Sequence, residues 1–155
     1  NWAHENVPAI LQAWYPGEEG GTAIADVLFG DYNPGGRLPV TFVKSLDQVP
    51  PFTDYSMKGR TYRYMEEEPL YPFGYGLSFT TFEYSNLKLS RETINAGESI
   101  NISVNVKNTG HVAGDEIVQL YIKDLEASVD VPIHELRGFK RIKLQPVRLP
   151  PYRLH

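Results

Sequence analysis

WYPGEEGGTAIADVLFGDYNPGGRLP (residues 14–39) places a short apolar run between two glycine-rich clusters. Over residues 22–29, apolar side chains recur at helical spacing, which predicts a short helix. Gly30 follows directly, and glycine most easily adopts the left-handed conformation that ends a helix. The stretch therefore predicts a glycine turn, a helix and a second turn.

The segments on either side of this helix favour strands. The apolar run Val7–Tyr15 has the length of a buried strand, and Pro39–Val43 has the composition of another. Together they predict strand, turn, helix, turn and strand, which is an α/β unit or the end of one.

Glycines ahead of a helix can also bind phosphate through free backbone N–H groups. The phosphate-binding loop pattern needs Lys and then Ser or Thr after its last glycine. Here Gly21 is followed by Thr22 and Ala23, and Glu18 and Glu19 would repel phosphate while complementing the helix dipole. The glycines are better explained by close packing of the helix on a strand.

Residues 58–80 predict an ordered connector. Thr61–Tyr64 has the composition of a short strand, and Tyr71–Phe79 spaces its aromatic residues with glycines. A free linker would not carry so many aromatic side chains.

From residue 81 the pattern changes to strict alternation of apolar and polar residues. Asn108-Thr109-Gly110 predicts a turn between two strands. The predicted strands are 82–89, 99–108, 116–123 and, more weakly, 137–144. An immunoglobulin-like or fibronectin-like sandwich has about seven strands, so these four would form about half of one. Half a sandwich would leave an unpaired strand edge and an uncovered apolar face that includes Ile100, Ile102, Val104 and Val106.

Composition excludes several classes of partner. The net charge is −4 and the 15 Lys and Arg residues form no run, so no nucleic-acid partner is expected. No apolar stretch approaches the roughly 18 residues of a membrane helix, so no membrane partner is expected either. The chain has no cysteine, and its localisation stays undetermined.

Acidic residues are the first candidates for catalysis, because glycosidases use two carboxyl groups that face each other across the substrate. Adjacent residues of one acidic run cannot do this, so the run 66–68 is expected to be a solvated turn and the pair 115–116 to cap a turn where a strand opens. The candidates are Glu18, Glu19, Asp31, Glu66, Glu67, Glu68, Asp115 and Glu116.

Other candidate sites are weaker. No two histidines have the spacing of a metal-ligand pair, so no metal site or cofactor is expected. Asn101-Ile102-Ser103 fits the glycosylation triplet on an outward strand face. Trp14, Tyr15 and Tyr62 would stack on sugars if exposed, although packing at an interface is the commoner role. The scattered histidines are His4, His111, His134 and His155.

Four longer motifs follow one another over about 140 residues. They are PAILQAWYPGEEGGTAIADVLFGDYNPGGRLPVTF (8–42), GRTYRYMEEEPLYPFGYGLSFTTFEYSNLKL (59–89), VNVKNTGHVAGDEIVQLYIKD (104–124) and HELRGFKRIKL (134–144). In sequence, order and spacing, these motifs together resemble family 3 glycoside hydrolases, the β-glucosidase and β-xylosidase group.

The resemblance implies a mixed α/β and β fragment. Residues 1–57 would be the C-terminal part of an α/β sandwich domain, 58–80 the connector, and 81–155 a partial fibronectin type III-like domain. The family's nucleophile lies in a preceding barrel domain and its acid/base glutamate lies upstream of WYPG. No catalytic residue is therefore expected in this chain, and the barrel is its expected intramolecular partner.

The implied parent enzyme is a retaining hydrolase of non-reducing terminal β-linked sugars, glucosides first. The chain alone is expected to be inactive. The alternative from another class is a stand-alone carbohydrate-binding or adhesion module, although residues 1–43 would make no sense in it.

Both ends of the chain depart from a complete family sequence. The opening Asn1-Trp2 without Met predicts a natural N-terminus further upstream. The tail 145–155 has three prolines and no alternation, which suits either a natural disordered end or a foreign reading frame.

Overall fold

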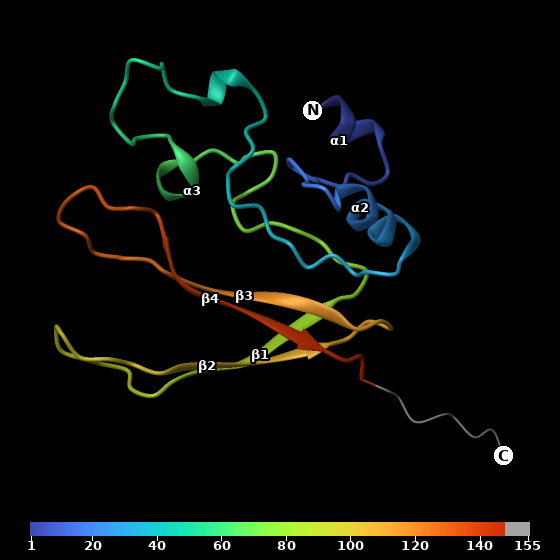
Figure 1. Cartoon of the computed structure of the whole chain (residues 1–155). Helices are drawn as coiled ribbons and strands as arrows, with labels where there is room; N and C mark the ends of the chain where they lie inside the picture. Colours follow the sequence, from blue (N-terminus) through green and yellow to red (C-terminus); the bar gives the residue numbers. More distant parts are fainter. Residues whose placement is uncertain (148–155) are drawn as a thin grey trace.

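The computed structural model describes residues 1–147. Helices, turns and long loops from residues 1–80 lie on one side, and two antiparallel hairpins lie on the other (Figure 1). The connector runs down from the loops into the first strand, so the two parts lie against each other. The prediction of an α/β segment followed by a partial β-sandwich is confirmed.

The helices are short, and only one was predicted. They are α1 (Trp2–Asn6), α2 (Gly20–Phe29), the 3-10 turn η1 (Leu46–Gln48) and α3 (Thr61–Tyr64). The prediction for α2 is confirmed, and Gly30 ends it in the left-handed conformation with φ 86°. No helix within residues 1–147 has the length and apolarity to cross a membrane.

Three predicted strands of the first part are wrong. Val7–Tyr15 is exposed and forms no strand, because no strand of the described residues lies beside it to complete a ladder. Of Pro39–Val43, only Phe42 makes a bridge, to Tyr71. Thr61–Tyr64 is helical, since the chain turns tightly at Gly59, whose N–H donates to the Tyr64 carbonyl at 3.1 Å. This local turn overrides the strand preference of the aromatic residues.

The four predicted strands of the second part are confirmed, with shifts of up to three residues at their ends. They pair as two separate antiparallel hairpins, and a bulge interrupts the first hairpin between Ser85 and Lys88. The strands are β1 (Phe82–Leu89), β2 (Ile102–Asn108), β3 (Gly114–Ile122) and β4 (Glu135–Leu144).

The best-buried side chains are polar. Among the described residues no large apolar side chain is buried, whereas Thr80, Asn108 and Glu116 are, and Asn108 is fully buried. Asn108 accepts a hydrogen bond from Thr80 Oγ1 at 2.7 Å and donates to the carbonyls of Val112 and Leu144 at 2.9 and 3.1 Å. Asn108 therefore fixes the predicted turn after β2 and ties it to the end of β4.

The apolar residues 100, 102, 104 and 106 are half-buried, and the alternation predicted for β2 is present. Large apolar side chains are exposed elsewhere on the hairpins, including Leu87 at 69% and Phe139 at 73%. Each two-stranded hairpin also leaves both of its edges without a partner strand in the described structure.

We expect the isolated 155-residue chain to self-associate, because exposed apolar surface and unpaired edges drive association. Sedimentation velocity from micromolar to tens of micromolar should show the average mass rising with concentration. A monomer at all concentrations that unfolds sharply and reversibly would contradict this expectation.

Candidate functional site

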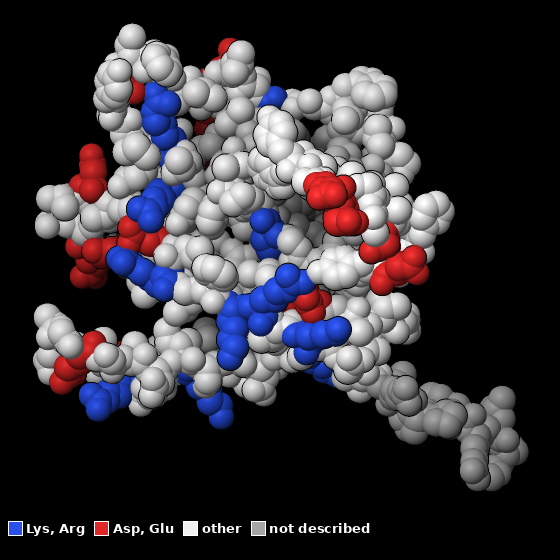
Figure 2. All heavy atoms as spheres, in the orientation of Figure 1, with Lys and Arg blue, Asp and Glu red and all other residues white. Residues whose placement is uncertain are grey.

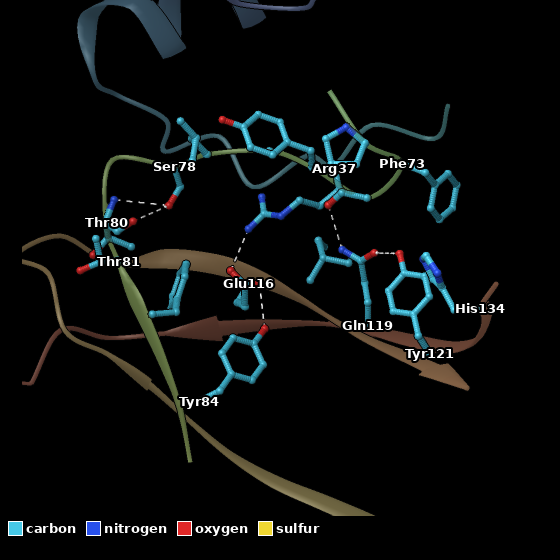
Figure 3. Close-up of a pocket in the computed structure, with 17 residues that line it drawn as sticks. Arg37, Phe73, Ser78, Thr80, Thr81, Tyr84, Glu116, Gln119, Tyr121 and His134 are labelled. Carbon is cyan, nitrogen blue, oxygen red and sulfur yellow. Dashed lines mark hydrogen bonds and ion pairs between the residues drawn. The ribbon is translucent and has the colours of Figure 1, made fainter. Parts of the chain in front are cut away.

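The clearest built site lies where the two parts of the chain meet. After α2 the chain crosses to β3 and β4 through residues 31–37, which we call the clamp segment. Its side chains contact the hairpins at three places, and the close-up in Figure 3 shows Arg37 pointing onto the face of β3.

Arg37 and Glu116 form the ion pair at the centre of this site. Arg37 Nη2 donates to Glu116 Oε2 at 2.7 Å, and the two side chains are only 12% and 10% exposed. Arg37 Nη1 also donates to the carbonyls of Gly35 and Gly36, each at 3.0 Å. The second carboxylate oxygen of Glu116 accepts from the Tyr84 hydroxyl at 2.9 Å. Both buried charges are thus hydrogen-bonded, as a buried ion pair requires.

The Tyr84 hydroxyl has a raised pKa. Burial of the hydroxyl is the largest cause, and the hydrogen bond and negative charge of Glu116 add to it, while Arg37 acts in the opposite direction. Although 48% of the residue is exposed, its hydroxyl end lies against the buried carboxylate. Tyr84 therefore serves as a neutral donor at this site.

Two further contacts hold the clamp segment. Asn33 donates to the Ala113 carbonyl at 2.8 Å and accepts from the Phe79 backbone N–H at 2.8 Å. The Tyr32 hydroxyl accepts from Arg141 Nη2 at 2.6 Å, and Arg141 Nε donates to Asp115 at 2.7 Å. The segment is thereby tied to the connector, to the turn before β3 and to β4.

The connector lies close against β3 at Gly74. Gln119 Nε2 donates to the Gly74 carbonyl at 3.0 Å, and Tyr121 donates to Gln119 Oε1 at 2.6 Å. Gly74 has φ +80°, and a Cβ there would overlap the Gln119 side chain, so only glycine fits. A hollow of about 710 Å³ lies along this seam, with Arg37, Glu116 and Tyr121 among its lining residues.

Aromatic rings close the far end of the seam. Tyr62 stacks on Phe73 with ring centroids 4.3 Å apart, and His134 lies 5.3 Å from Tyr62 and 5.1 Å from Tyr121. The Ile133 N–H donates to the Arg63 carbonyl at 2.6 Å. Of the three aromatic residues considered for sugar stacking, Tyr62 is thus used in packing.

The predicted acidic candidates do not assemble into a catalytic pair. Glu18, Glu19 and Asp31 are exposed, and Glu19 accepts only from Thr22 at 3.1 Å. The run 66–68 is exposed, as expected. Glu67 accepts a hydrogen bond from the Gln48 side chain, and Glu68 forms an ion pair with Lys44. Asp115 and Glu116 lie at the start of β3, as predicted, but they form ion pairs with Arg141 and Arg37 instead of capping a turn.

The other candidates are dispersed. His4 contacts Tyr71, with Nδ1 2.8 Å from its hydroxyl, while Asn101 is exposed and His155 lies outside the described residues. Tyr15 is 99% exposed and Trp14 packs partly on Phe42. Within residues 1–147, no three His, Asp or Glu side chains gather in a group that could hold a metal ion.

Sequence reasoning missed the Arg37–Glu116 pair, although a signal was present. Glu116 shares its strand face with Val118, Leu120 and Ile122, because residues two apart point the same way. A carboxylate on an apolar face needs a buried cation as partner. The sequence did not show that this cation comes from Arg37, 79 residues earlier.

Comparison with known proteins identifies the family. The pattern of the glycosyl hydrolase family 3 C-terminal domain matches residues 1–79. The chain belongs to glycosyl hydrolase family 3. In this family 3 chain, the pattern of the fibronectin type III-like domain also matches residues 116–148.

Its relatives include named glycosidases. The chain is 55% identical over 141 residues to a xylan 1,4-β-xylosidase from Xylanibacter ruminicola, covering 91% of this chain and 16% of that protein. It is 45% identical to a periplasmic β-glucosidase from Salmonella typhimurium, covering 92% of this chain and 20% of that protein. The solved structure of a β-glucosidase from Erythrobacter marinus superposes on this chain with a TM-score of 0.80 at 49% sequence identity. The superposition covers 93% of this chain and 19% of that protein. The chain thus spans about a fifth of the length of the relatives it matches.

We expect Glu116→Gln to lower the free energy of unfolding by about 3 kcal/mol, because it leaves Arg37 buried without a counter-charge. The matched control is Glu68→Gln, which removes one carboxylate of an exposed pair and should change stability by less than about 1 kcal/mol. Thermal unfolding at one fixed protein concentration compares them. Equal shifts for the two variants would contradict a special role for Arg37–Glu116.

We expect alkaline pH to destabilise the chain partly through Tyr84. The unfolded chain loses this proton near the ordinary pKa of 10.0, whereas the folded chain keeps it. The stabilisation is therefore complete below pH 10 and is lost as the pH rises above it. Tyr84→Phe should flatten the fall in unfolding temperature between pH 10 and 11.5, and an unchanged slope would disprove the role of this hydroxyl.

Proposed function

We propose that the chain is the C-terminal part of a retaining β-glycosidase that removes non-reducing terminal β-linked sugars, with β-glucosides as the first substrate class and β-xylosides as the second. The named relatives act on β-glucosides or β-xylosides, which supports this substrate class. The role of the chain within that enzyme is structural.

The single observation that carries the structural role is the clamp at the domain junction. Its buried ion pair holds residues 31–37 on β3, while the candidate carboxylates lie on separate exposed turns or are taken up in ion pairs. An acidic side chain that is already paired with arginine is poorly suited to donate a proton to a leaving group.

We propose the division into 1–57, 58–80 and 81–155 for this enzyme, with the junction placed along the connector. The nucleophile would lie in a preceding barrel domain and the acid/base in the earlier part of the α/β domain. In this arrangement the clamp would brace the α/β domain that presents the acid/base.

A stand-alone carbohydrate-binding module is the second candidate, and the exposed side chains of Tyr15 and Trp14 favour it. The match of residues 1–79 to the C-terminal domain of glycosyl hydrolase family 3 favours the enzyme fragment instead.

The test replaces the homologous segment of the Xylanibacter ruminicola xylosidase with this chain. We expect the purified 155-residue chain to release no p-nitrophenol from aryl β-glucoside or β-xyloside above buffer. The chimera should hydrolyse aryl β-xyloside, because the segment supplies the brace that the enzyme needs.

Turnover by the isolated chain that is lost on changing one acidic residue would disprove the structural role. A folded chimera without activity would disprove the proposed place in the enzyme. Retention of the isolated chain on cellulose or xylan is the separate readout for the module.

A further inference from the structure

Residues 44–68 form a small lobe with its own hydrogen bonds. The Gln48 side chain accepts from the Lys44 backbone N–H at 2.7 Å and donates to Glu67 at 3.0 Å, so the start and the end of the lobe are tied together. In Figure 1 the lobe stands at the upper left, and α3 lies near the segment that precedes β4, where the Ile133 N–H donates to the Arg63 carbonyl. The loop at residues 50–58, by contrast, is held by hydrogen bonds within the lobe.

The outer loop of this lobe is locked by one arginine. Arg60 Nη2 donates to the carbonyls of Pro51 at 2.9 Å and Asp54 at 2.8 Å, and reaches that of Pro50 at 3.5 Å. Asp54 Oδ1 also accepts from the Ser56 N–H at 2.8 Å, which closes a tight turn. The loop is therefore ordered before it meets any partner.

This locked loop carries two aromatic side chains with no contact to another ring of the described structure. Phe52 is 91% exposed and Tyr55 is 90% exposed. The rings of Tyr62 and Tyr71 are by contrast stacked on their neighbours Phe73 and Tyr75. We call Phe52 and Tyr55, with the loop between them, the aromatic tip.

The charge of the aromatic tip favours an uncharged ligand. Asp54 and Lys58 oppose each other in sign, and Arg60 is occupied by backbone carbonyls. In the space-filling view, basic and acidic side chains are interspersed at the upper left, where the lobe lies, while basic side chains gather over the β3–β4 hairpin (Figure 2). Residues 52–58 therefore carry no net charge that would complement a polyanion, a cationic protein or an acidic membrane surface.

We propose that the aromatic tip is a stacking platform for an uncharged β-linked oligosaccharide. The C–H faces of β-linked pyranose rings are apolar and lie flat on aromatic rings, while their hydroxyl groups stay in water. Because the loop is locked by Arg60, binding orders little that was mobile before. The inference rests on the proposed function, since it takes the ligand to be the β-linked chain that the parent enzyme trims.

The test is affinity electrophoresis of the whole 155-residue chain in gels that contain soluble arabinoxylan or hydroxyethylcellulose. We expect Phe52→Ala/Tyr55→Ala to lower the affinity about tenfold, which corresponds to about 1.4 kcal/mol. The control pair Leu28→Ala/Phe29→Ala removes two apolar groups at the end of α2 that are 69% and 84% exposed, and it should leave the affinity unchanged. The conservative pair Phe52→Tyr/Tyr55→Phe should bind like the original chain.

Three results would overturn the platform. The first is that neither polysaccharide retards the original chain. The second is that the tip pair and the control pair lose the same affinity for the polysaccharide. The third is that the tip pair loses self-association while its retardation is unchanged. The third result would assign the tip to a second copy of the chain. Each leaves the hydrolysis test of the chimera untouched, so failure of the platform is distinguishable from failure of the proposed function.

Discussion

The ion pair between Arg37 and Glu116 is the constraint on which the junction depends. Both charges leave water, and such a pair is stable only when its remaining donors and acceptors are satisfied. Gly35, Gly36 and Tyr84 meet that requirement by supplying two carbonyls and a hydroxyl. The ion pair thus holds the clamp segment on β3, and the Tyr84 hydroxyl links β1 to the same carboxylate.

Polar contacts define this junction more than apolar burial does. Asn108 links the turn after β2 to the end of β4, and Asn33 links the clamp to the turn before β3. Hydrogen bonds are directional, so these asparagines determine one relative placement where an apolar contact would tolerate sliding. Within the described residues, apolar side chains are at most partly covered, which makes this directionality more important.

This arrangement gives the acidic candidates of the described residues structural contacts within a chain that belongs to a family of hydrolases. In family 3 relatives the segment is about a fifth of the whole length. Its acidic residues take structural roles here: Glu116 and Asp115 pair with arginines, and Glu68 pairs with Lys44. These ion pairs stabilise the fold. The aromatic tip lies on a separate loop, which the hydrogen bonds of Arg60 hold in place.

The sequence by itself determined the elements whose pattern is local. Helix α2, its glycine end and the four alternating strands follow from periodicities of 3.6 and 2, and the family follows from four motifs in order. Tertiary structure decided the rest, because it depends on partners far along the chain. Only the fold shows that 7–15 has no neighbouring strand, that the chain coils at 61–64, and that Arg37 meets Glu116 across 79 residues. Periodicity shows which face a side chain shares, and the partner of a buried charge is set by where distant segments meet.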